Sequence, residues 1–157
     1  MEMHATRTIA AQRETVWAAL NDPEVLKACI PGCEELTGSP EDGFEAVVKQ
    51  KVGPVKATFK GAVTLSDVVP GVSYTISGEG KGGVAGFAKG SAQVALADAE
   101  GGGTELTYDV DAKVGGKLAQ LGSRLVDSFA TKMADQFFER FQTRLEGPAD
   151  GDAAPEA

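Results

Sequence analysis

Residues 55–65 read Val55-Lys56-Ala57-Thr58-Phe59-Lys60-Gly61-Ala62-Val63-Thr64-Leu65, and apolar side chains alternate with polar or small ones along this stretch. A period of two is typical of a β-strand with one buried face and one solvated face. Residues 44–52 and 104–112 alternate in the same way. Strands of this kind predict an antiparallel sheet whose apolar face needs a cover.

Turn residues separate these segments at short intervals. Gly53-Pro54, Pro70-Gly71, Gly82-Gly83 and Gly101–Gly103 lie between successive alternating stretches. Parallel strands need a crossover connection of a dozen or more residues, and no such connection fits between these turns. The pattern therefore predicts an antiparallel meander.

The predicted cover is a C-terminal helix extending from about Gly116 to Leu145. Its apolar side chains recur every three or four residues, and they are Leu118, Leu121, Leu125, Phe129, Met133, Phe137 and Phe141. A helix of this length, roughly 45 Å, is long enough to cross a sheet. We therefore predict an α+β fold, in which a curved antiparallel sheet of six or seven strands wraps around the long C-terminal helix.

The N-terminal segment predicts a strand over 3–10 and a helix over 13–21. Asp22 followed by Pro23 is typical of an N-cap and first helical residue, so a second short helix is expected through Leu26. Residues 1–146 are predicted to form one ligand-binding domain. Residues 147–157 are predicted to be a disordered acidic tail, because this composition provides few apolar side chains to bury.

Charge and hydropathy narrow the functional class. The chain has a net charge of -8, which disfavours nucleic acid as a partner and also disfavours electrostatic binding to anionic lipid. It has no run of about 18 apolar residues and no basic stretch followed by an apolar signal core. We therefore expect a cytoplasmic protein.

Small residues on the predicted inner face suggest a binding cavity. The parity of Tyr74 and Ile76 places Gly78 and Gly80 inward, and the next strand places Gly86 and Gly90 inward. Small residues opposite a helix rich in Leu and Phe leave volume for an apolar ligand, although the glycines would equally permit a sharply bent sheet. The candidate ligand-binding residues are Gln50, Phe59, Tyr74, Gly78, Gly90, Tyr108, Leu121, Leu125 and Phe129.

No catalytic or metal-binding constellation is evident. The only histidine, His4, lies near the terminus, whereas a Ser-His-acid triad needs a histidine in the interior. Cys29 and Cys33 are too few for a zinc site. We expect no enzymatic activity, no metal and no covalently bound cofactor. Lys49, Lys51, Lys56 and Lys60 predict a solvated outer face, and a docking surface for an acidic partner is the alternative.

Four segments resemble the CoxG family, which is named after the G component of carbon monoxide dehydrogenase. They are AAQRETVWAAL at 10–20, the turn Cys29-Ile30-Pro31-Gly32-Cys33, the hairpin at 52–61 and GGKLAQLGSRL at 115–125. The resemblance extends over residues 1–146. It implies the helix-grip fold of the START-like (SRPBCC) superfamily and an accessory role beside a molybdenum hydroxylase of the carbon monoxide dehydrogenase type.

The same resemblance implies an apolar ligand, a quinone or another lipid, and recruitment of the partner enzyme to the membrane. We expect membrane contact to be indirect or transient, peripheral at the inner membrane face. Two alternatives are a docking adaptor with a filled core and an enzyme of the cyclase or aromatase type.

Overall fold

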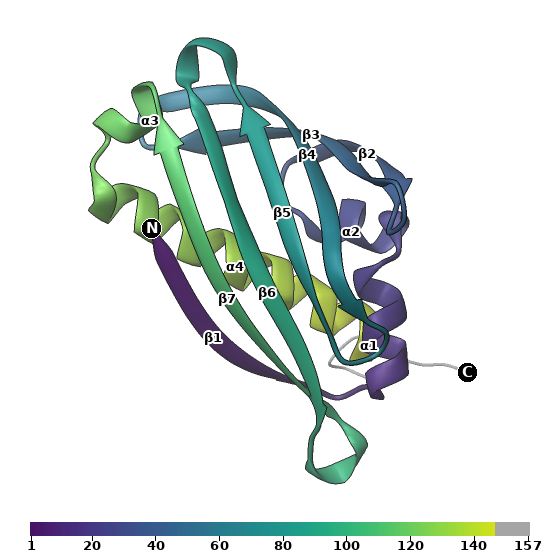
Figure 1. Ribbon diagram of the computed structural model, residues 1–157. Helices are drawn as coiled ribbons and strands as arrows, with labels where there is room; N and C mark the ends of the chain where they lie inside the picture. The colour runs from purple at the N-terminus through teal and green to yellow at the C-terminus, as the bar shows by residue number, and fades with distance from the viewer. Residues whose placement is uncertain (147–157) are drawn as a thin grey trace.

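Seven strands form one antiparallel sheet in the spatial order β1-β7-β6-β5-β4-β3-β2 (Figure 1). They are β1 (Glu2–Ile9), β2 (Cys33–Ser39), β3 (Gly43–Val52), β4 (Val55–Val69), β5 (Ser73–Lys81), β6 (Phe87–Asp98) and β7 (Thr104–Gly115). The computed structural model describes residues 1–146, and the predicted disorder of 147–157 lies outside this range. Burial alternates along β4 as its sequence predicts.

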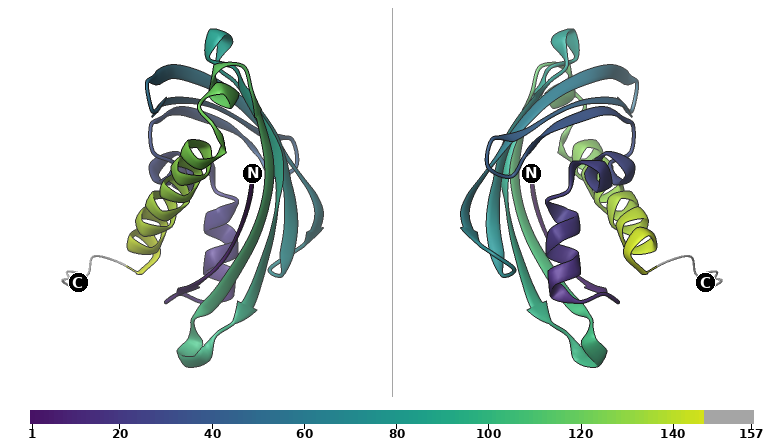
Figure 2. Two further views of the ribbon diagram at one scale, coloured as in Figure 1. Left: turned by 90° about the vertical axis from the view of Figure 1, so that its left-hand side faces the viewer. Right: turned by 90° about the vertical axis from the view of Figure 1, so that its right-hand side faces the viewer.

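The helices lie on the concave side of the curved sheet (Figure 2). They are α1 (Arg13–Leu20), α2 (Pro23–Cys29), α3 (Lys117–Gln120) and α4 (Ser123–Glu146), with 3-10 turns η1 (Gly83–Ala85) and η2 (Glu100–Gly102). The predicted α+β helix-grip architecture is confirmed. No helix within residues 1–146 is both long enough and apolar enough to cross a membrane.

The N-cap predicted for α2 is present. The Asp22 carboxylate accepts a hydrogen bond from the Glu24 amide at 2.9 Å, and Pro23 is the first helical residue. The helix continues to Cys29, beyond the expected end at Leu26. Val25 and Cys29 are buried, so the last turn of α2 is stabilised by tertiary packing in addition to local sequence preference.

The single C-terminal helix expected from Gly116 to Leu145 is wrong, because the chain breaks between α3 and α4. Gly122 has a φ of 90°, a left-handed conformation that glycine adopts at little cost. The break rotates α4 relative to the simple 3–4-residue pattern. Leu125 is therefore 37% exposed, and the neighbouring Val126 is the residue that faces the sheet.

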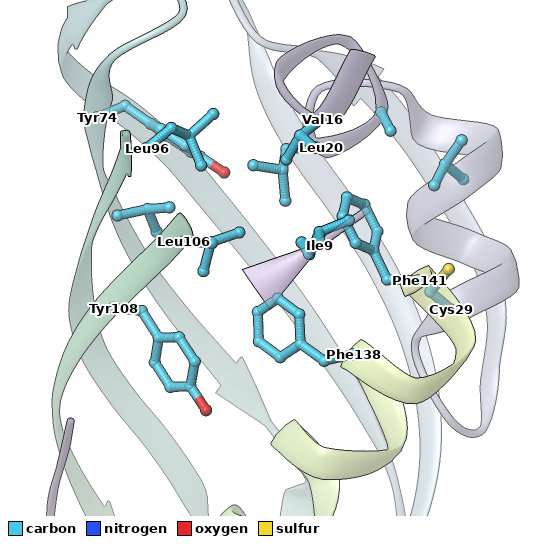
Figure 3. Packing of buried hydrophobic residues seen from close by; sticks show 13 residues of the cluster. Ile9, Val16, Leu20, Cys29, Tyr74, Leu96, Leu106, Tyr108, Phe138 and Phe141 are labelled. Atoms are coloured by element: carbon cyan, nitrogen blue, oxygen red, sulfur yellow. The ribbon is translucent and has the colours of Figure 1, made fainter. Parts of the chain in front are cut away.

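The tightly packed core lies at the end of the sheet near α1 (Figure 3). Ile9, Val16, Leu106 and Phe141 are almost completely buried there. Buried Thr104 donates a hydrogen bond from its hydroxyl to the Ala11 carbonyl at 2.7 Å, which satisfies a polar group inside the core. This filled end anchors α4 against the sheet and leaves the opposite end to a different use.

Candidate functional site: a two-compartment apolar cavity

The space between the sheet and α4 contains a cavity of about 470 Å³ at the α3 end of the molecule. We call it the α3-side cavity. Its sheet wall includes Phe59, Gly80 and Ala88, and its helix wall includes Phe129 and Met133. The period of two on the strands and the 3–4-residue period on α4 point these side chains toward one another. Gln50 is the one side chain with a nitrogen or oxygen among its described lining residues.

A second cavity of about 370 Å³ lies closer to α1. We call it the α1-side cavity. Tyr74 and Tyr108 contribute the polar side-chain atoms of its described wall, and Leu20, Ile76 and Phe138 are among its apolar lining residues. Both cavities have volumes in the range of small-molecule sites.

The two cavities are adjacent compartments of one interior. Five residues border both, from β1, the loop after α2, β7 and α4: Met3, Ile30, Val110, Ala134 and Phe137. These side chains form an apolar partition, and no charged side chain borders either compartment within residues 1–146. An elongated apolar molecule fits such an arrangement, because burying it leaves no ionised group without solvent.

The sequence-predicted site residues fall into two groups. Gln50, Phe59 and Phe129 border the α3-side cavity, and Tyr74 and Tyr108 border the α1-side cavity. Gly78, Gly90, Leu121 and Leu125 do not border either one. Leu121 and Leu125 flank the helix break at Gly122, so their place in the sequence pattern did not give their orientation.

The predicted glycines differ in the space that they leave. A Cβ built on Gly80 has no heavy atom within 4 Å, so this glycine faces open volume. A Cβ on Gly78 would lie 2.4 Å from Val63 Cγ1, and one on Gly90 would lie 2.4 Å from the Asp111 carbonyl oxygen. Gly78 and Gly90 therefore permit the close approach of a strongly curved sheet, and a large side chain at Gly90 would disrupt the fold.

The Gln50 side chain connects β3 to the turn after α2. Its Nε2 donates a hydrogen bond to the Pro31 carbonyl at 2.5 Å, and both Ile30 and Pro31 border the α3-side cavity. Sequence reasoning missed these two turn residues. Two adjacent apolar residues in a short turn were the available signal.

The polar groups of the α1-side cavity are the two tyrosine hydroxyls. Burial raises the pKa of Tyr74 above its ordinary value, so its hydroxyl keeps its proton. Arg7 Nη2 lies 3.5 Å from the Tyr108 hydroxyl oxygen, is 2.5 Å from Asp135 Oδ1, and its guanidinium lies 4.7 Å from the Phe138 ring centroid. Arg7 therefore links the edge strand β1 to α4 beside this compartment.

The remaining reactive side chains lie away from both cavities. His4 contacts Asp109 on the exposed outer face. Cys29 and Cys33 are both free, and burial raises the pKa of each thiol, so the protonated form is favoured. Within residues 1–146, no three His, Cys, Asp or Glu side chains gather in a way that could hold a metal ion.

The curved sheet, the long helix and the apolar interior between them define a START-like helix-grip domain. Residues 6–146 match the CoxG family, whose description names it as the G component of carbon monoxide dehydrogenase, and the chain belongs to this family. No curated protein matches the sequence.

Solved structures show the same fold. A conserved protein from Geobacillus kaustophilus is similar to this chain with a TM-score of 0.86 and 29% identity, over 93% of this chain and 95% of that chain. A START superfamily protein from Mycobacterium smegmatis aligns with a TM-score of 0.68 and 18% identity, over 92% and 97%. A Thermus thermophilus protein aligns with a TM-score of 0.67 and 17% identity, over 92% and 97%.

Proposed function

We propose that the protein is a ligand-carrying accessory protein of a molybdenum hydroxylase of the carbon monoxide dehydrogenase type. It holds a lipophilic quinone or a similar lipid between the sheet and α4, and it brings the enzyme to its membrane electron acceptor. Family membership supports the accessory role. The observation that carries the ligand proposal is the pair of adjoining apolar compartments.

A quinone suits the distribution of polar groups. Its apolar tail would occupy the α3-side cavity, where Gln50 is the only described polar side chain. Its carbonyl oxygens would accept hydrogen bonds from the Tyr74 and Tyr108 hydroxyls in the α1-side cavity. A buried hydroxyl without a partner costs about 1–3 kcal/mol, so a ligand carbonyl stabilises the complex at this point.

Chemical turnover is not part of this proposal. Acid–base catalysis needs a group that gains and loses a proton near neutral pH. The titratable groups among the described lining residues are the two tyrosines, and Tyr74 is held in its neutral form. Proteins with a START-like fold are mostly binding proteins, which fits a carrier.

Native mass spectrometry of the purified protein tests the proposal. We expect a fraction of the protein to carry a noncovalent apolar molecule, which organic extraction identifies as a quinone or lipid. Protein stripped of this molecule should bind added decylubiquinone, detected as quenching of Trp17 fluorescence, because Trp17 packs edge-to-face on Tyr74 with ring centroids 5.1 Å apart. Protein that carries no such molecule and gives no saturable quenching would contradict the carrier role.

A further inference from the structure

Three segments that are far apart in the sequence meet at one end of the molecule. They are the β3–β4 turn (51–56), the β5–β6 turn with η1 (80–88) and the end of β7 through the start of α4 (112–126). Gly53 packs against the Leu125 side chain, Gly86 lies against the backbone of Gly116, and Gly82 packs on the Phe59 ring. Figures 1 and 2 place α3 and the β5–β6 turn at the end opposite the β6–β7 turn. We call these three segments the basic end.

The basic end is positively charged although the whole chain is acidic. Its segments contain six exposed cations and no Asp or Glu: Lys51, Lys56, Lys81, Lys113, Lys117 and Arg124. Within residues 1–146, none of the six forms an ion pair with a carboxylate. The rest of the chain has 9 basic and 23 acidic residues. The net charge of -8 therefore conceals a strong separation of charge, and the expectation drawn from it does not apply to this end.

Exposed apolar side chains lie among these cations. Val84 at the tip of η1 is 86% exposed, Phe87 is 41% exposed and Leu125 is 37% exposed. Side chains of this kind surrounded by polar residues mark a protein or membrane contact. Apolar tips that insert at the headgroup level, ringed by Lys and Arg, are typical of interfacial membrane binding.

The basic end also forms one wall of the α3-side cavity. Leu118, Val126 and Phe59 border that cavity from elements whose opposite faces carry Lys117, Arg124 and the lysines of β4. A ligand that leaves the cavity between these elements emerges at the charged, apolar surface. A membrane is the reservoir from which a water-insoluble molecule can enter by this path.

We infer that the basic end is the surface by which this protein docks on an anionic lipid membrane to exchange its apolar ligand. The inference rests on the proposed carrier function and adds the contact surface and the lipid charge. Val84, Phe87 and Leu125 enter the headgroup region, and the six cations contact the lipid phosphates. Glu79, Asp111 and Asp127 lie just outside the three segments, and they are too few to cancel the positive charge.

Vesicle co-flotation tests the docking surface. The wild-type protein is expected to bind vesicles that contain phosphatidylglycerol, to bind pure phosphatidylcholine vesicles weakly, and to dissociate as salt is raised. Each Lys or Arg removed should weaken binding about fivefold. The double variant Lys117→Gln/Arg124→Gln should therefore bind about 25-fold more weakly, and Val84→Asp should also reduce binding.

Matched controls lie at the other end of the chain's fold. Arg140→Gln/Arg144→Gln removes two exposed cations from the end of α4, and Val68→Asp changes a valine that is 46% exposed on β4. Both are expected to bind vesicles like the wild type. Equal losses in these controls, or no preference for phosphatidylglycerol, would overturn the docking surface. So would a basic end that binds an acidic protein while vesicle binding stays absent.

A second measurement separates this inference from the carrier function. The basic-end variants should still take up decylubiquinone presented in detergent micelles, because their substitutions lie outside the cavity. Their transfer of the quinone out of phosphatidylglycerol vesicles should fall together with vesicle binding. A wild-type protein that binds vesicles through this end but takes up no decylubiquinone would contradict the carrier function and support the docking surface.

Discussion

A Gly80→Leu variant is expected to keep its fold and to bind decylubiquinone about 5- to 150-fold more weakly than the wild type. Gly80 faces open volume in the α3-side cavity, so a leucine occupies space that the ligand needs. Forcing extra methylene groups into an occupied site costs about 1–3 kcal/mol. Titration of Trp17 fluorescence with decylubiquinone measures the change.

An Ala95→Leu variant is the matched control, because Ala95 is exposed on the outer face of the neighbouring strand β6. It adds a side chain of the same final size without entering the cavity, so its quinone affinity should equal that of the wild type. The melting temperature of Gly80→Leu should not fall, since removing a glycine from a strand lowers the entropy of the unfolded chain. Unchanged quinone affinity in Gly80→Leu would exclude the α3-side cavity as the binding site.

Phe141→Ala should lower the free energy of unfolding by about 3–5 kcal/mol. Phe141 is fully buried, and its ring stacks on Phe137 at 5.6 Å and meets Phe138 edge-on at 6.2 Å between centroids. This loss is a large part of the total stability of a typical domain. Guanidinium denaturation followed by circular dichroism measures it.

Phe129→Ala provides the comparison at the other end of α4. Phe129 borders the α3-side cavity, so its ring has fewer packing contacts to lose, and the destabilisation should be clearly smaller than for Phe141→Ala. The two values together distinguish a filled end from a hollow end of the same helix. Equal losses would show that the two ends are packed to the same density.

The strands were predictable because each is long enough to show its alternation. Residues 55–65 have one apolar face in the sequence and the same face buried in β4. Asp22 and Pro23 likewise located the start of α2, because a side-chain cap and a proline act locally. These signals depend on neighbours within a few residues, which the sequence displays directly.

The cavity was only partly predictable, because it depends on contacts between distant residues. Parity placed Gly78, Gly80 and Gly90 on the inner face, but only sheet curvature brings Val63 against Gly78 and the Asp111 carbonyl against Gly90. The helix break at Gly122 is a single left-handed residue inside an otherwise helical pattern. For this reason Leu121 and Leu125 were assigned to a site that they do not border.

The charge separation was hidden from the sequence for a similar reason. Residues 51–56, 80–88 and 112–126 are each weakly basic, and an acidic total dominates their average. Pairing of β3 with β4 and of β6 with β7, together with the turn of α3, brings these cations to one end. Net charge describes the whole chain, whereas a membrane or a partner contacts one face of it.

Diffraction from crystals grown with decylubiquinone tests the central claim most directly. We expect electron density for the quinone between β4 and α4, with its tail against Phe59 and Met133 and its ring passing Phe137 toward Tyr108. Crystals in which both compartments are empty, with the quinone bound on the outer face of the sheet, would contradict a ligand site between the sheet and α4.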